Sequence, residues 1–361
     1  MTDIRYWIAL SMLPDIGPVS VKKLLSAFGG PEKIFDATPD ELLDIENIGR
    51  LRAEKIRQFS AWKEVDTLAR RVEQKGITAI PFDSPSYPPM LREVGDAPVV
   101  IYQRGHFAPQ DQCAVAVVGS RRPTHYGAST AARVADDLAS IGLSIVSGMA
   151  RGIDSIAHQN ALRAGGRTLA VLGSGIDVPY PPENKGLMEK IVGSGCVISE
   201  FPPGTPPDKE HFPRRNRLIS GLSLGVLVVE ATPESGALIT ARYATEQGRE
   251  VFAIPGAVHS MHSAGPHDLI RKGATLVRHA HDIIEELAPV LKGFLRLTGR
   301  TERDVTEEEE NLCRLLSGEP KQIDDISRES GLPPSKVLSV LLGLEMKGAV
   351  KQISGKRFYL A

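Results

Sequence analysis

Six short apolar runs that alternate with amphipathic stretches constrain the fold of this chain most. The runs are nearly continuous in Val, Ile, Leu and Ala, as expected of strands that are buried on both faces. They lie at 113–119, 143–148, 167–173, 195–200, 224–230 and 249–256. Helical patterns lie between them, several of which end in glycine, at 127–142, 153–166, 184–195 and 235–248. This alternation predicts an α/β fold with a doubly wound, mostly parallel sheet and right-handed crossovers.

Two smaller modules flank this α/β segment, which spans residues 76–290. Residues 1–75 read as an all-α domain of short helices with two similar glycine turns, at 13–17 and 45–49. A helical stretch follows each turn, which is the helix-hairpin-helix pattern. The free N–H groups at such a helix start can hold a phosphate, although packing without a ligand explains the turns equally well. Residues 291–305 predict a linker, and 306–361 predict three helices and a hairpin, which is a winged helix.

Composition excludes a protein that is basic all over. The net charge is −1 over 361 residues, so any binding of nucleic acid must come from clustered charge. The three cysteines lie far apart in the sequence and argue against a disulfide framework. The N-terminus lacks the layout of a signal peptide, and no apolar run approaches a membrane span. We expect a cytoplasmic protein without a membrane partner.

Candidate binding residues follow the predicted strands, because ligands of open α/β sheets bind outside the carboxyl ends of the strands. Four successive loops each carry a cation, although residues 113–290 hold 17 Lys plus Arg against 17 Asp plus Glu. Glycine and serine beside these cations are expected to let backbone N–H groups approach an anion. The candidates are Gly119, Ser120, Arg121, Arg122, Ser147, Gly148, Met149, Arg151, Gly173, Gly175, Asn184, Lys185, Phe212, Arg214, Arg215, Asn216, Arg217, Glu230, Ser235 and Gly236.

A basic edge of this length favours an extended polyphosphate, and a single nucleic acid strand fits it. Phe212 and Tyr180 offer a base a stacking face, although core packing or loop rigidity is the simpler explanation for Tyr180. Any single arginine, taken alone, is more often a solvated surface charge. The prediction therefore depends on the four loops together.

The sequence lacks the motifs of several enzyme classes. It contains no GxGxxG, no GxxxxGK[ST] and no GxSxG at a strand end. Asp154 and His158 are spaced for a helix contact, which a buried structural pair explains better than catalysis. His259, His262 and His267 suggest a metal loop, but no cysteine or carboxylate stands at ligand spacing, so a polar loop is favoured. We predict no metal, no cofactor and no enzymatic activity.

These residues together resemble the DNA-processing protein A family (DprA/Smf). The shared motifs are Tyr87-Pro88 with Leu91, then 119–121, 147–154, 180–181, Asn184, 199–200, 212–220, 229–231, 235–240, 255–256, 269–270 and 273–274. The resemblance implies an extended Rossmann-like domain that binds and protects incoming single-stranded DNA in natural transformation and competence. It also implies loading of the RecA recombinase in DNA recombination, and a homodimer whose surface lies toward the end of that domain. Carried over by motif, Gly119, Ser120 and Arg121 form a phosphate pocket, and Lys185 with 214–217 holds the DNA backbone.

Two alternatives stay open at this point. One is a Rossmann-like nucleotide-processing hydrolase that resembles phosphoribohydrolases, with Glu230 and 235–240 as its active corner. That family has a double glycine before Gly-Thr, which this sequence lacks. The other is a regulator that binds duplex DNA through the winged helix. Its recognition stretch, 333–348, carries only Lys336 and Lys347, so protein contacts or packing are expected there instead.

Overall fold

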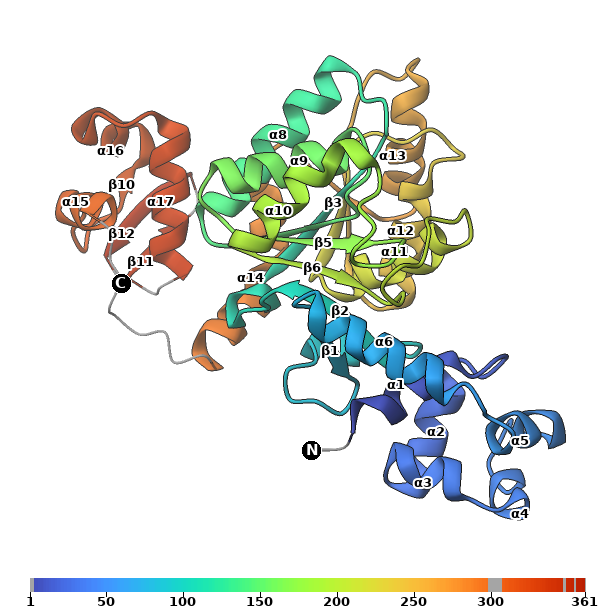
Figure 1. Ribbon diagram of the computed structural model, residues 1–361. Helices are drawn as coiled ribbons and strands as arrows, with labels where there is room; N and C mark the ends of the chain where they lie inside the picture. The colour runs from blue at the N-terminus through green and yellow to red at the C-terminus, as the bar shows by residue number, and fades with distance from the viewer. Residues whose placement is uncertain (1–2, 298–306, 347–348, 354, 361) are drawn as a thin grey trace.

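A nine-stranded sheet forms the centre of the protein (Figure 1). The structure is a computed structural model that describes residues 3–297, 307–346, 349–353 and 355–360. The strand order is β1-β2-β6-β5-β4-β3-β7-β8-β9, in which β3 to β9 run parallel and β2 joins β6 antiparallel. The strands are β1 (Thr78–Pro81), β2 (Val100–Gly105), β3 (Ala114–Val118), β4 (Ser144–Ser147), β5 (Thr168–Leu172), β6 (Cys196–Ser199), β7 (Gly225–Val228), β8 (Glu250–Ala253) and β9 (Thr275–Leu276).

The six predicted strands are confirmed as β3 to β8, and so is the doubly wound, mostly parallel sheet. Strands β1, β2 and β9 were not predicted from the sequence. The first two extend one side of the sheet antiparallel, and β9 is a two-residue strand at the opposite edge. β1 and β9 are short edge strands with partly exposed residues, which need no long apolar run, whereas β2 begins with four buried residues.

Helices cover both faces of the sheet, which makes three layers (Figure 1). Val115 and Val117 of β3 face one helical layer, and Ala114 and Ala116 face the other. The first layer contains α8 (His125–Ser140), α9 (Ile153–Arg163), α10 (Lys185–Ser194) and α14 (Ala280–Leu297). The second contains α7 (Pro89–Arg92), α11 (His211–Gly221) and α12 (Gly236–Glu246). A further helix, α13 (Met261–Arg271), follows β8.

Three segments that the sequence predicts as irregular begin or form helices. The basic run at 212–217 lies in α11 rather than in a loop, and most of the histidine-rich stretch lies in α13, although Pro266 stands inside that helix. The predicted linker at 291–305 begins within α14, which continues to Leu297, while residues 298–305 lie outside the described part. In α14, burial of an apolar stripe against the sheet favours helix in a segment whose local sequence is ambiguous.

The N-terminal module contains the two predicted hairpins. Gly17 and Gly49 precede the second helix of each hairpin, and Asp15 and Asn47 take φ of 60° and 67° in the turns. Each turn carries an acid that pairs with a lysine of the other hairpin: Asp15 with Lys55, and Glu46 with Lys23. The helices are α1 (Ile4–Met12), α2 (Pro18–Phe28), α3 (Pro31–Asp36), α4 (Pro39–Leu43), α5 (Arg50–Arg57) and α6 (Trp62–Gln74). Two ion pairs therefore connect the hairpins.

The C-terminal module is the predicted winged helix, with a core of its own around Leu312, Ile326, Leu341 and Phe358. It contains α15 (Glu307–Leu315), β10 (Lys321–Gln322), α16 (Ile323–Ser330), α17 (Pro334–Met346), β11 (Val350–Ile353) and β12 (Arg357–Leu360). Leu342 of α17 is buried in the core cluster that includes α14, and not in this local core.

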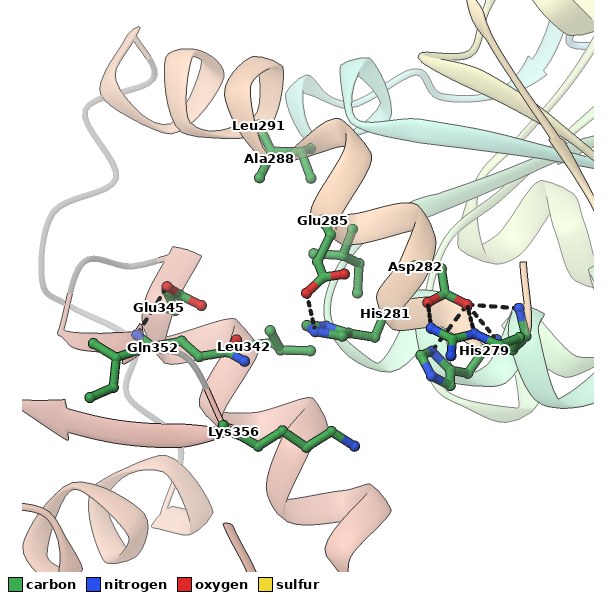
Figure 2. A pocket seen from close by; sticks show the side chains of 14 residues that line it. His279, His281, Asp282, Glu285, Ala288, Leu291, Leu342, Glu345, Gln352 and Lys356 are labelled. Carbon is green, nitrogen blue, oxygen red and sulfur yellow. Dashed lines mark hydrogen bonds and ion pairs between the residues drawn. The ribbon is translucent and has the colours of Figure 1, made fainter. Parts of the chain in front are cut away.

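A cavity of about 790 Å³ lies where the winged helix meets α14. Figure 2 shows His281 and Glu285 of α14 on one side and Leu342, Gln352 and Lys356 of the winged helix on the other. The helix that a winged helix would place in a DNA groove therefore packs on the α/β domain. Among the described helices, none is both long and apolar enough to cross a membrane.

Candidate nucleic-acid interface at the strand ends

The loops after β3, β4 and β5 meet the start of α11 at the carboxyl edge of the sheet. The guanidinium of Arg121 lies over the Phe212 ring, 5.6 Å from its centroid, and the Phe212 and Tyr180 rings are 5.5 Å apart. The side-chain amide of Asn184 donates to the carbonyl of Met149 over 2.8 Å. Strands β4 to β6 lie on one side of β3, and β7 to β9 lie on its other side. This edge therefore includes the switch point at which such sheets bind ligands.

Five cations are exposed along this edge and are here called the basic rim: Arg121, Arg122, Arg151, Lys185 and Arg214. Arg151 pairs with Glu183, and Arg214 lies 3.6 Å from the carboxylate of Glu200. The other three have no ion-pair partner among the described residues. Their charge is therefore available to an anion that approaches from solvent.

Two aromatic rings, Tyr180 and Phe212, lie beside the basic rim. The Tyr180 side chain is exposed, and the Phe212 ring is half-buried over Gly173, where a Cβ would lie 2.7 Å from the ring. A second stack, of His211 at the start of α11 on the buried Phe201, has ring centroids 4.1 Å apart. Exposed rings next to cations are the arrangement on which proteins stack successive bases of a single strand.

The amino ends of the helices that follow these strands also face this edge, and they add partial positive charge. At the amino end of α8 a carboxylate of the protein already occupies the place of an anion. Glu230 accepts hydrogen bonds there from the backbone N–H (2.9 Å) and the hydroxyl (2.5 Å) of Thr124. Glu230 is buried and packs against Gly127, and Ser235 caps α12 beside the exposed Gly236. Glu230 thus supplies the anion for α8 and holds the loops after β3 and β7 together.

Three of the four residues at 214–217 point into the protein. Arg215 donates to the carbonyls of Gly148 and Val171, and burial lowers its pKa to about 10 despite the opposing charge of Asp154. The amide of Asn216 donates to the carbonyl of Gly236, 3.2 Å away.

Arg217 pairs with Glu200 and, over 3.3 Å, with Asp96. The expectation that the whole run holds a DNA backbone is thereby corrected. The helical turn leaves Arg214 outside and orients the others inward, so within this run only Arg214 remains a candidate phosphate ligand.

Several glycines of these loops are required by packing inside the protein. A Cβ on Gly119 would lie 2.8 Å from Ile153, and one on Gly148 would lie 2.4 Å from the Arg215 guanidinium. A Cβ on Gly175 would lie 2.6 Å from the carbonyl oxygen of Pro202. Gly152, at the start of α9, has φ of 74° and lies against the Ser120 carbonyl, which brings the loops after β3 and β4 together.

The remaining predicted residues shape the loop after β4. Ser147 donates to the carbonyl of Val117, and Met149 is buried with a φ of 61°, which is rare for a residue with a side chain. Asp154 accepts from the backbone N–H groups of Gly148 and Ala150, and burial raises its pKa. Ser120 accepts from the backbone N–H of Arg122. No local sequence signal marks these inward roles, because they depend on which loop each residue meets.

Comparison with known proteins identifies all three segments. The family model described as DNA recombination-mediator protein A matches residues 78–288. A DprA winged helix domain matches 298–356, and a SAM-like helix-hairpin-helix tandem matches 8–61. The matches at 78–288 and 8–61 lie within the segments predicted at 76–290 and 1–75, whose boundaries stay predictions.

Relatives match over the full length of the chain. Protein Smf of Escherichia coli is 38% identical over 98% of this chain and 95% of its own length, and Protein Smf of Synechocystis is 35% identical over 99% and 98%. The X-ray structure of DprA from Streptococcus pneumoniae superimposes with a TM-score of 0.68 and 37% identity, over 79% of this chain and 99% of that one.

DNA processing protein A from Helicobacter pylori, in a structure titled for its single-stranded DNA binding mode, has a TM-score of 0.54 and 30% identity, over 59% and 96%. The family model alone covers more than half of this chain, and two relatives extend across nearly all of it. The chain therefore belongs to the DprA/Smf family of DNA recombination-mediator proteins.

Proposed function

We propose that this protein binds single-stranded DNA at the basic rim and protects it, without catalysing a reaction on it. The observation that carries the proposal is the Arg121 guanidinium over the Phe212 ring, which lies next to the Tyr180 ring, with Arg122 and Lys185 exposed in the loops of the same edge. Cations suit phosphates, and the rings suit unpaired bases, which a duplex keeps stacked inside. The single-stranded DNA binding named for the Helicobacter pylori relative supports the same ligand.

The test is a salt titration of a fluorescent oligothymidine and of the matching duplex. We expect tighter binding to the single strand, and a negative slope of log affinity against log salt. Arg121→Glu should weaken binding by at least about tenfold, because it removes a phosphate contact and introduces repulsion next to Phe212.

The matched control is Arg163→Glu, which has the same charge change at the far end of α9, and it should bind as the wild type does. Equal affinity of Arg121→Glu and the wild type would refute the site.

A nucleotide-hydrolysing active site centred on Glu230 is disfavoured by the geometry at α8. In such a site the carboxylate must reach the substrate, whereas Glu230 is buried and satisfied by Thr124. Its neighbour His262 lies 3.7 Å away, too far for a hydrogen bond. Purified protein incubated with nucleoside monophosphates should release no base, and release that disappears in Glu230→Gln would establish the hydrolase instead.

We further propose that the bound strand is handed to the RecA recombinase during natural transformation, which places the protein's work in the cytoplasm. The description of the matching family as recombination mediators supports a step of this kind. The measurement is the rate at which RecA filaments form on a covered oligonucleotide, with and without this protein. An unchanged rate would refute the loading step without contradicting the proposed DNA binding.

A homodimer formed at the β9 edge is part of the same proposal. β9 pairs on one side only, and Leu276 within it is 43% exposed, so the strand offers free backbone groups next to an apolar side chain. Leu276→Glu should convert a dimer to a monomer in sedimentation, whereas Leu51→Glu, on exposed α5, should not. A monomeric wild type would contradict the dimer.

A further inference from the structure

One carboxylate connects the N-terminal module to two loops of the strand-end edge. Asp177 lies in the loop after β5, and its Oδ2 accepts from Arg71 Nη2 at 3.0 Å and Lys75 Nζ at 2.5 Å. Its Oδ1 accepts from the backbone N–H of Gly204, in the loop after β6, at 2.6 Å. We call these four residues the Asp177 latch. Arg71 belongs to the last turn of α6, and Lys75 is the first residue after this helix.

The latch is charged, and its carboxylate is largely enclosed. The Asp177 side chain is 9% exposed, and burial alone would raise its pKa. The hydrogen bonds from Lys75 and Gly204 outweigh that effect, and they hold the pKa below its ordinary value. Asp177 is therefore ionised at neutral pH. Gly204, with φ of 89°, leaves the space that the Arg71 guanidinium fills, since a Cβ there would lie 2.5 Å from it.

The segment that Asp177 anchors is the one that carries Tyr180. Between them the chain is tightly bound to itself: the Val178 N–H donates to the Gly175 carbonyl, and Ser174 donates to the Val178 carbonyl. Gly175 in turn donates to the Thr205 carbonyl of the loop after β6. Tyr180 lies three residues beyond Asp177, so we expect a displacement of Asp177 to shift the ring.

The module has other attachments to the α/β domain, so the latch is not needed to hold it in place. The Lys22 ammonium of α2 donates to the carbonyls of Val94 and Gly95. Trp7 and Leu10 of α1 share a core cluster with Tyr102 of β2. Figure 1 shows the module beside β1 and β2, with α6 next to the sheet. Loss of the latch should therefore disturb the Tyr180 segment more than the docking of the module.

We propose that the N-terminal module positions the Tyr180 side of the DNA site through Asp177, so that module docking sets single-strand affinity. The inference rests on the proposed single-stranded DNA binding. Asp177 is a positioning residue, because its oxygens face α6 and Gly204 and leave none for DNA. The module thereby acts on DNA binding without a DNA contact of its own at this point.

The experiment measures oligothymidine affinity of the full-length chain by fluorescence anisotropy. Asp177→Asn should weaken binding about three- to tenfold, as expected when a base loses part of its stacking contact. Tyr180→Ala should weaken binding to a similar or greater extent. The double variant should be no weaker than Tyr180→Ala alone, because both changes act through the same ring.

A purely structural defect would instead multiply with the loss caused by Tyr180→Ala. Multiplied losses, or normal binding by Asp177→Asn, would overturn the inference. Asp136→Asn is the matched control, since its pair with Arg163 joins α8 to α9 away from the rim, and it should bind normally. If Asp177→Asn does not fold, Lys75→Met removes one donor at a side chain that is 44% exposed, and it should still show a loss. A wild type that binds no oligothymidine would refute the proposed function itself, which separates the two failures.

Discussion

Two consecutive arginines, Arg214 and Arg215, show how far the role of a residue depends on its direction. Arg214 is 59% exposed and lies over the Phe201 ring, whereas Arg215 is buried beneath the loop after β4. A guanidinium in that position donates to two carbonyls and is stabilised by the charge of Asp154, and its loss leaves these two carbonyls without their charged donor. One residue is thus suited to bind a ligand and the next to support the fold.

Substitution by methionine should separate these two roles. Arg215→Met should lower the free energy of unfolding by about 3–5 kcal/mol, as expected when two buried carbonyls lose a charged hydrogen-bond donor. Arg214→Met should change stability by less than about 1 kcal/mol, yet weaken single-strand binding. Urea unfolding and anisotropy measure the two effects. A larger loss of stability for Arg214→Met than for Arg215→Met would contradict the assignment.

At the scale of elements, α9 and the end of β4 support the site from within. His158 of α9 is fully buried, and its Nδ1 lies 2.6 Å from the Thr168 hydroxyl of β5. Burial, with the charge of Arg215, lowers the His158 pKa to about 3. The ring therefore packs as a neutral group between helix and sheet. Asp154, one turn earlier, holds the loop that α9 follows, so the helix connects the core to the rim.

This packing predicts a pH dependence of stability. The unfolded chain binds a proton on His158 near pH 6.5, but the folded chain does so only near pH 3. Stability from this group is therefore complete above pH 6.5 and falls as the pH drops toward 3. His158→Gln should reduce the slope of unfolding free energy between pH 4.5 and 6.5 by up to about 1.4 kcal/mol per pH unit.

Chemical denaturation at several pH values gives the slopes. Identical slopes for the wild type and His158→Gln would mean that the ring is protonated in the folded protein.

For the whole molecule, the two flanking modules contact different parts of the α/β domain. The N-terminal module reaches the DNA site through Asp177, whereas the winged helix lies against α14, beyond the first helical layer (Figure 1). Leu342 of α17 is 5% exposed in the α14 cluster, and Lys336 of the same helix pairs with Glu308. The winged helix thus presents its recognition helix to the protein rather than to a groove.

Leu342→Asp should detach the winged helix without unfolding it, because its own core is formed by other residues, Leu341 and Leu344 among them. We expect faster hydrogen exchange in α14 around Ile284 and Leu287, and unchanged affinity for oligothymidine, since the rim lies elsewhere. A loss of single-strand affinity that matches Arg121→Glu would show that the winged helix contributes to the site.

The sequence by itself determined the kind of fold, because its main signals are local. A strand buried on both faces must be apolar throughout, so β3 to β8 are visible as runs, and a ligand of a parallel sheet must meet the loops that follow them. The turns at Gly17 and Gly49 and the hairpin of the winged helix are also local patterns. These signals predicted the edge of the sheet and the residues of the basic rim, such as Arg121.

Only the tertiary structure decided which residues face that edge. Arg215 and Arg217 are buried, Glu230 fills the amino end of α8, and Gly148 makes room for a guanidinium, all through partners distant in sequence. Asp177 was not predicted to matter, because its donors come from α6 and from Gly204. Periodicity shows which side of a strand or helix is apolar, but the direction of a polar side chain depends on what the folded chain places beside it.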